Sequence, residues 1–408
     1  MEAGIRARGH WHAGVLLLVL LLTAASVVAG ERVGRAIDFL LEAQLEDGLF
    51  RYRHDFIDGR DSRRNNIVRQ AGAAYALGEY LDGGSDPRVE AALRRALAAL
   101  DRRSIPWRDG RLVSLDGTTA GAKTGATALA LLALLQGGLT GPEMQRRLDA
   151  WLRGLLALQR ADGGFRSRPG VERASPYSDG EAWLALASYH RRHPLDDRVA
   201  VALQQADRGL MERYRRNPGI GFFHWGVMAA AVRYHTTGEA RFRRFAADQM
   251  RFFLDSLRPR VNPRSNSCYS VEGLVAGAGV LAAGGDDELL DRVRERVAAE
   301  MEKNLALQLR PGQDRIVFGQ GRYLVAPELP RYRGGFLDGA HRPQLRIDST
   351  QHCLSALLKL ERGGIPGRRG APASSPVRGI PEPTAALQHL PGGVGEHAMA
   401  VDDHAELP

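Results

Sequence analysis

The sequence predicts an all-α fold, an (α/α)6 toroid of twelve helices with an inner and an outer ring. Two kinds of helical pattern alternate along the chain, and each kind occurs six times. A helix with one polar and one apolar face lies at a surface, whereas a helix that is apolar all round is buried. Because units of two helices need stacked neighbours to cover their apolar faces, six units closed into a double ring satisfy both patterns.

The first kind of helix is amphipathic, with apolar residues at three- and four-residue spacing and charged residues between them. The predicted outer helices are residues 33–46, 87–101, 142–159, 196–216, 239–257 and 287–308. The second kind carries almost no charge after its first turn. The predicted inner helices are residues 66–81, 122–135, 179–190, 224–235, 268–283 and 348–360.

Both ends of the chain differ from this pattern. Arg6 and Arg8 precede an uncharged run from Ala13 to Ala29, which is the layout of a secretory signal. The tail is rich in Gly, Pro, Ala and Ser, a composition typical of disorder. We therefore predict a leader or membrane anchor at residues 1–30, the toroid at residues 31–362 and a disordered tail at residues 363–408.

The leader predicts export to the periplasm, the outside of the cell or the outer side of a membrane, with membrane attachment if it stays uncleaved. The formal net charge is +9, and nearly all of the cations are arginine. A basic protein favours acidic partners, and for an exported protein we expect an acidic oligo- or polysaccharide and not a nucleic acid. Cys268 and Cys353 are the only cysteines, so they either pair once, bind a metal or stay as buried thiols.

Two related turns support the repeat. Residues 44–50 and 159–165 both read Gln, two residues, Asp-Gly, one residue, Phe, and each turn ends an outer helix. Asp-Gly suits a turn that needs a positive φ, so we expect these turns to be structural. We also expect them at the end of the ring opposite the inner-helix starts.

With these turns and the helix alternation, residues 31–362 resemble the six-hairpin toroid enzymes, which include glycoside hydrolases, polysaccharide lyases and sugar epimerases. More distantly they resemble terpenoid cyclase and prenyltransferase toroids. The resemblance implies that the substrate cleft lies where the inner helices begin. The sequence leads to the same place, because the polar residues of the inner helices gather at their N-termini.

The candidate site therefore combines carboxylates, cations and aromatic rings at these helix starts. The predicted acid and base are Asp179 and Glu272, with Glu181 or Asp348 as replacements. The predicted substrate-binding residues are Asn66, Arg69, Lys123, Tyr177, His224, Trp225, Tyr269 and His352. Phe222 and Phe223 are further aromatic candidates. Asn66, Asp179 and Asp348 are also favoured helix-capping types, so capping is an alternative role for them.

These residue types fit more than one reaction. Glycoside hydrolysis needs one protonated and one ionised carboxylate, and hydrolysis of an acidic, uronate-containing glycan is the first hypothesis. An epimerase or lyase acting on uronate sugars removes a proton beside a carboxylate, using a His or Tyr base and an Arg or Lys partner. A binding or scaffold protein would have the same kinds of residue at the inner-helix N-termini, but without a complete acid–base pair. Ion pairs of Arg69 with Glu181 or Glu272 would make the charges structural.

A prenyltransferase-like zinc enzyme is the remaining alternative. Cys268, Asp348 and His352 have side chains that bind zinc, and the segments that begin at Cys268 and Cys353 resemble parts of protein prenyltransferase β subunits. The spacing differs, however, because His352 adjoins Cys353 and an Asn stands where the family has an aspartate ligand. We therefore expect no metal and no cofactor.

Overall fold

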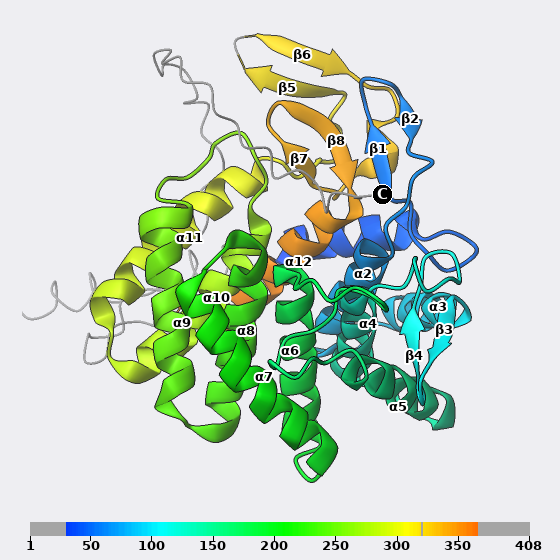
Figure 1. Cartoon of the computed structure of the whole chain (residues 1–408). Helices are drawn as coiled ribbons and strands as arrows, with labels where there is room; N and C mark the ends of the chain where they lie inside the picture. The colour runs from blue at the N-terminus through cyan, green and yellow to red at the C-terminus, as the bar shows by residue number, and fades with distance from the viewer. Residues whose placement is uncertain (1–29, 320, 366–408) are drawn as a thin grey trace, which may run out of the picture.

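The computed structural model describes residues 30–319 and 321–365 of the chain. Nearly all of the predicted leader and of the predicted tail lies outside these residues. Six inner helices pack side by side, and α12 (Ile347–Gly363) contacts α2 (Ile67–Leu81), which closes the ring (Figure 1). The other inner helices, in ring order, are α4 (Thr124–Gly137), α6 (Pro176–Arg192), α8 (Ile220–Thr237) and α10 (Cys268–Gly284).

The outer ring alternates with the inner one along the chain. Its members are the helix at residues 30–43, α3 (Pro87–Arg102), α5 (Pro142–Leu156), α7 (Asp197–Arg216), α9 (Ala240–Phe252) and α11 (Asp287–Leu305). The all-α double ring predicted from the sequence is confirmed. No helix among the described residues is long and apolar enough to span a membrane.

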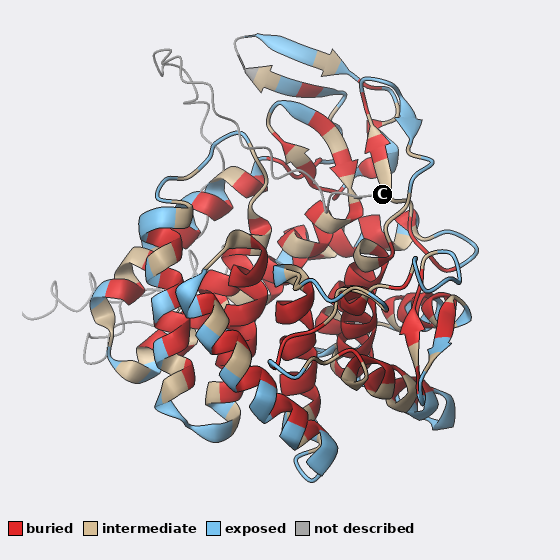
Figure 2. Ribbon diagram, in the orientation of Figure 1, coloured by how far each residue is buried: buried red, intermediate tan, exposed pale blue. Residues whose placement is uncertain are grey.

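Burial explains why the two sets differ in sequence. In α4 every residue from Thr124 to Leu135 is buried, because neighbouring inner helices and outer helices surround it. In α3, buried residues such as Val89, Leu93 and Leu97 alternate with exposed charges. Figure 2 shows the buried residues concentrated in the inner helices and the exposed ones on the outer faces.

Several helix starts differ from the prediction. α6 begins at Pro176 because Ser175 is the N-cap and its hydroxyl accepts from the backbone N–H of Ser178. α8 begins at Ile220, four residues before His224. The predicted helix at residues 239–257 is divided into α9 and a π-helical turn, η1 (Phe253–Leu257).

The structure also contains short strands that the sequence analysis did not predict. A four-stranded sheet has the order β2 (Arg60–Asp61), β1 (Arg53–Asp55), β8 (Arg342–Arg346), β7 (Leu337–Gly339). Two hairpins complete the set: β3 (Ser104–Trp107) with β4 (Gly110–Val113), and β5 (Arg315–Gly319) with β6 (Arg322–Val325). Because β1 precedes α2 and β8 precedes α12, the sheet joins the first and last inner helices at the N-terminal end of the ring (Figure 1).

The two Asp-Gly turns have the same structure. Gly48 and Gly163 have φ of 89° and 80°, and a Cβ atom at either would collide with a backbone carbonyl of the next outer helix. The turns do not lie at the end that we expected. Each outer helix runs directly into the loop before an inner helix, so the turns lie at the inner-helix N-termini, where Gln70 of α2 bonds to Phe50.

Candidate functional site

The position of a residue within the first turns of an inner helix decides which way its side chain points. Successive residues are about 100° apart around an α-helix, so the fourth and sixth residues point to nearly opposite sides. The fourth residues of four inner helices point outward, and each accepts a hydrogen bond from a backbone N–H in the preceding loop. These residues and their donors are Gln70 with Phe50, Thr127 with Val113, Asp179 with Phe165 and Thr350 with Phe336.

Asp179, the first choice for acid or base, therefore holds a structural position. Its Oδ1 accepts from Phe165 N–H at 2.7 Å, and its Oδ2 accepts from the Tyr214 hydroxyl at 2.7 Å and from Arg213 Nη1 at 2.9 Å. Burial raises the pKa of Asp179, although these three contacts oppose the shift. Both oxygens are occupied, and the structure does not bring Asp179 together with Glu272.

Four titratable side chains come from the fifth or sixth residue of an inner helix. These are Glu181 of α6, His224 of α8, Glu272 of α10 and His352 of α12. Three of the four are deeply buried. Nδ1 of His352 lies 2.6 Å from Oε1 of Glu272, which has no solvent exposure. The ring centroids of His224 and His352 are 5.6 Å apart, with the rings nearly perpendicular.

The two histidines have opposite electrostatic environments. Burial lowers the pKa of His224 well below its ordinary value, and the nearby His352 and Lys359 charges lower it further. Burial also opposes the charged form of His352, but the charge and hydrogen bond of Glu272 and the charge of Asp348 raise its pKa overall. The surroundings therefore favour the neutral form of His224 and the protonated form of His352.

The same group contains unsatisfied polar atoms. Both ring nitrogens of His224 lack a hydrogen-bond partner among residues 30–319 and 321–365, and so does Oε2 of Glu272. A buried polar atom without a partner costs roughly 1–3 kcal/mol. Such atoms in one place are typical of a site whose remaining contacts come from a ligand.

Glu181 is a third titratable group in this region. Burial raises the pKa of Glu181 to about 8, and the charge of His352 opposes the shift. Its carboxyl packs against Gly125 of α4, where a Cβ atom would collide with Oε2. At neutral pH Glu181 is therefore mostly protonated and can donate a proton.

Aromatic rings surround the histidines. The Tyr269 centroid is 5.6 Å from His224 and 6.2 Å from His352, and the Trp225 centroid is 4.5 Å and 6.1 Å from the same two rings. Tyr177, half-buried, packs on Gly221 at the start of α8. Phe222 and Phe223 are fully buried in the core, so their rings are not exposed at the inner-helix N-termini.

The remaining predicted residues have local partners. Asp348 accepts from Arg69 Nε at 3.0 Å and from Arg346 Nε at 3.1 Å. Burial would raise the pKa of Asp348, but the charges of Arg346, Arg69 and His352 lower it. Arg69 is therefore paired with Asp348.

Helix capping explains two of the predicted binding positions. Asn66 is the N-cap of α2, and its side chain accepts from the backbone N–H groups of Val68 and Arg69 at 3.0 and 3.3 Å. Lys123 occupies the N-cap position of α4 and is half-buried.

The cysteines pair. Cys268 and Cys353 form a disulfide between the first turn of α10 and the second turn of α12, directly beside Tyr269 and His352 in the sequence. The Cys268 sulfur is therefore not available as a zinc ligand, and the zinc hypothesis loses one of its three residues. Within the described part of the chain, no three His, Cys, Asp or Glu side chains form a group that could hold a metal ion.

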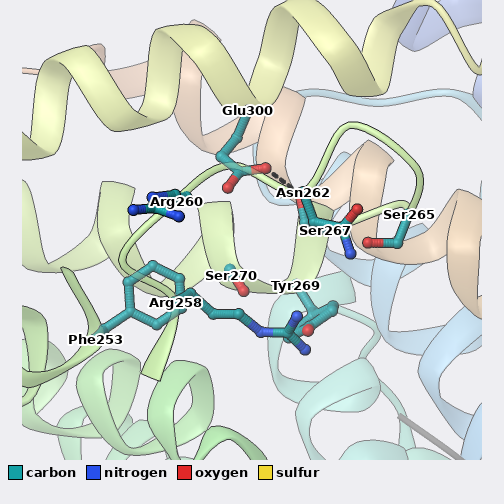
Figure 3. Close-up of a pocket in the computed structure, with 9 residues that line it drawn as sticks. All are labelled: Phe253, Arg258, Arg260, Asn262, Ser265, Ser267, Tyr269, Ser270 and Glu300. Carbon is teal, nitrogen blue, oxygen red and sulfur yellow. Dashed lines mark hydrogen bonds between the residues drawn. The ribbon is translucent and has the colours of Figure 1, made fainter. Parts of the chain in front are cut away.

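A small cavity of about 10 Å³ is lined, apart from Tyr269, by residues that were not predicted from the sequence. It is lined by Phe253, Arg258, Arg260, Asn262, Ser265, Ser267, Tyr269, Ser270 and Glu300 (Figure 3). Tyr269 belongs both to this pocket and to the aromatic group around His224 and His352. The sequence held one signal for this pocket, because residues 256–271 contain three arginines and no acidic residue.

Comparison with known proteins supports the fold. No protein-family model matches the sequence, and no curated protein matches it. A sugar epimerase from a ruminal bacterium is similar in structure, with a TM-score of 0.59 at 10% identity over 84% of this chain and 100% of the epimerase. An inactive variant of an α-1,6-mannanase from Salegentibacter sp. HEL1_6, in complex with α-1,6-mannotetrose, gives 0.60 at 11% identity over 82% of this chain and 98% of the mannanase.

An unsaturated glucuronyl hydrolase specific for heparin is a third similar structure, with a TM-score of 0.55 at 12% identity over 81% of this chain and 96% of the hydrolase. Identities this low establish the fold and not the reaction. The resemblance predicted from the helix alternation and the Asp-Gly turns is confirmed: this chain has the six-hairpin glycosidase-like toroid fold.

Proposed function

We propose that the protein is a sugar epimerase, which removes a proton from the carbon beside a sugar carbonyl and returns one to the opposite face. The observation that carries the proposal is the pair His224 and His352, with ring centroids 5.6 Å apart and pKa values shifted in opposite directions. Pairs of titratable groups whose environments separate their pKa values are typical of acid–base catalysis. Similar structures include both a sugar epimerase and hydrolases, so the histidine pair, and not the structural similarity, decides between the reactions of the fold.

Each side chain has a defined task in this reaction. The neutral imidazole of His224 takes the proton from the sugar carbon, which leaves an enediolate. The imidazolium of His352, held in place by Glu272, gives a proton to the other face. Tyr269 and Trp225 supply the surfaces against which the sugar ring or chain packs.

Glycoside hydrolysis, the first hypothesis from the sequence, is the second candidate. Glu181 favours it, because a carboxyl with a pKa of about 8 is a suitable general acid and Glu272 could serve as the second carboxylate. The pairing of Glu272 with His352 favours epimerisation instead, since it leaves only Oε2 of Glu272 to act on a sugar.

Solvent isotope incorporation separates the two reactions. Reducing sugars are incubated with the protein in D2O, and NMR follows deuterium at the carbon beside the carbonyl together with the epimeric product. We expect incorporation by the wild type, a loss of about 100-fold or more in His224→Gln and His352→Gln, and retention in Glu181→Gln. His235→Gln is the matched control, because His235 lies in the last turn of the same helix as His224.

Other results would identify the alternatives. New reducing ends from oligosaccharides without deuterium uptake, lost in Glu181→Gln, would establish a hydrolase. Products that absorb ultraviolet light would identify a lyase. Sugar binding with no conversion of any substrate would leave a binding protein.

We also propose that the protein is exported. The leader pattern at residues 1–30 supports this, as does the Cys268–Cys353 disulfide, because disulfides persist in oxidising compartments. Fractionation of the producing cells, with mass spectrometry of the N-terminus, tests both export and cleavage of the leader. Recovery of the full-length chain from the cytosol with reduced cysteines would refute it.

A further inference from the structure

The loop between η1 and α10 holds Arg258 firmly by its backbone and leaves its side chain unused. The Arg258 N–H donates to the Phe253 carbonyl at 2.9 Å, and the Arg258 carbonyl accepts from Arg296 Nη1 at 2.7 Å. The half-buried guanidinium of Arg258 has no ion pair or hydrogen bond with any residue of the described ranges. A positioned arginine without a carboxylate is suited to a planar or tetrahedral oxyanion.

The pocket that Arg258 lines also offers unused hydrogen-bond donors. Ser270 is 2% exposed, and within residues 30–319 and 321–365 its hydroxyl has no hydrogen-bond partner. The same is true of the Tyr269 hydroxyl, toward which the Arg258 side chain points (Figure 3). Both residues lie in the first turn of α10, where the Cys268 N–H already donates to the Asn266 side chain, so the side chains are the donors that remain for a ligand.

The one carboxylate of the pocket is already neutralised. Glu300 accepts from the Ser267 hydroxyl at 2.5 Å and pairs with Lys303 Nζ at 2.8 Å, and Arg296 Nε lies 3.5 Å away. Arg258 and Arg260 therefore give the pocket a net positive charge. The Arg258 charge extends to α6, where with Arg69 it opposes the burial that raises the pKa of Tyr177.

We infer that Arg258, Tyr269 and Ser270 form an anion subsite that binds the carboxylate or phosphate group of the substrate. This inference rests on the proposed function, because Tyr269 places the subsite next to the His224–His352 pair. Arg258 thereby replaces Arg69 as the residue expected to bind the acidic group of a sugar, since Arg69 is paired with Asp348. The substrate class is a sugar with one oxyanion group a short distance from its carbonyl carbon.

Binding measurements test the subsite without requiring turnover. The probes are D-glucuronate for the carboxylate, glucose 6-phosphate for the phosphate and D-glucose as the neutral reference, titrated into the full protein by calorimetry. We expect one of the two anions to bind at least about 10-fold more tightly than glucose. Arg258→Gln should weaken the binding of that anion about 10- to 100-fold and change the affinity for glucose less than about 3-fold.

Arg264→Gln is the matched control, because Arg264 is exposed on the same loop and does not line the pocket. It removes the same charge and should leave the affinity for the anion unchanged. Ser270→Ala should weaken the binding of the anion about 3- to 10-fold. A general charge effect of the loop would not cause this loss, because the substitution removes no charge. The anion that responds to Arg258 identifies the group as carboxylate or phosphate.

The subsite and the proposed reaction can fail separately. Equal affinities for the two anions and glucose, or equal losses in Arg258→Gln and Arg264→Gln, would overturn the subsite even if the protein epimerises a neutral sugar. Arg258-dependent anion binding in a protein that exchanges no deuterium would support the subsite and overturn the epimerase proposal. Thermal unfolding of each variant in buffer verifies that a loss of binding is not a loss of folding.

Discussion

Asp179 and Gln70 hold equivalent positions: each is the fourth residue of an inner helix, and each accepts the backbone N–H of the phenylalanine that closes an Asp-Gly turn. Asp179 has two further partners, Arg213 and Tyr214 on α7. The carboxylate thus links the inner helix α6 to the turn that precedes it and to the outer helix α7 that follows it. Its burial is explained by this structural role.

Asp179→Asn should therefore destabilise the protein without affecting chemistry. The amide cannot match a carboxylate that accepts from three donors, so we expect a loss of about 2–3 kcal/mol in unfolding free energy. Activity per folded molecule should change less than about 3-fold. Denaturant unfolding and initial rates measure the two, with the exposed Asp197 replaced by Asn as the control. A fully stable but inactive variant would make Asp179 part of the reaction.

Glu272→Gln should shift the pH dependence of the reaction. The wild type needs a neutral His224 and a protonated His352, and Glu272 raises the pKa of His352 against the effect of burial. Without the carboxylate the pKa of His352 falls, so the alkaline limb of the rate profile moves to lower pH. The rate at pH 7.5 should fall about 100-fold. A profile that keeps its alkaline limb would contradict this role, and Glu295→Gln, on the exposed face of α11, is the control.

His224 should make the protein less stable in acid. The pKa of His224 is lowered in the folded state, so below pH 6.5 the unfolded chain binds a proton that the folded protein does not bind. Stability therefore falls as pH drops, by at most about 1.4 kcal/mol per pH unit for one group. Denaturant midpoints at pH 8, 6.5 and 5 should decline less steeply in His224→Gln than in the wild type or His235→Gln. Parallel declines would show that His224 is protonated in the fold.

The disulfide should contribute strongly to stability. Cys268 and Cys353 are 85 residues apart, and the chain-entropy model assigns a loop of that length about 4–5 kcal/mol. The Cys268→Ser/Cys353→Ser variant should unfold at lower denaturant than the wild type, and reduced wild type should match it. Two titratable thiols in the denatured, unreduced wild type would refute the pairing.

The sequence was sufficient for the fold because the inner helices are buried on all sides. A segment such as residues 124–135 of α4 tolerates no charge, and six such segments require a closed arrangement. The short strands could not be predicted, since pairings such as β1 with β8 join residues almost 300 positions apart and leave no local pattern.

The site was predicted only in part, because it depends on where each helix begins. The sequence pattern predicts that α6 begins at Asp179, whereas Ser175 and Pro176 start the helix three residues earlier. Three residues turn a helix by about 300°, which decides that Asp179 faces outward while Glu181 does not. His224, Glu272 and His352 were correctly placed at one end of the ring. Their pairing could not be predicted from sequence, since it depends on the packing between helices.

The strand pairing between β1 and β8 has a consequence for synthesis on the ribosome. His54 pairs with Leu345, so the seam of the toroid cannot close until nearly the whole domain has been translated. Until then α2 lacks α12 as a neighbour, and its apolar side stays open to other chains. Nascent chains that stop before residue 342 should therefore depend on chaperones more than the complete domain does.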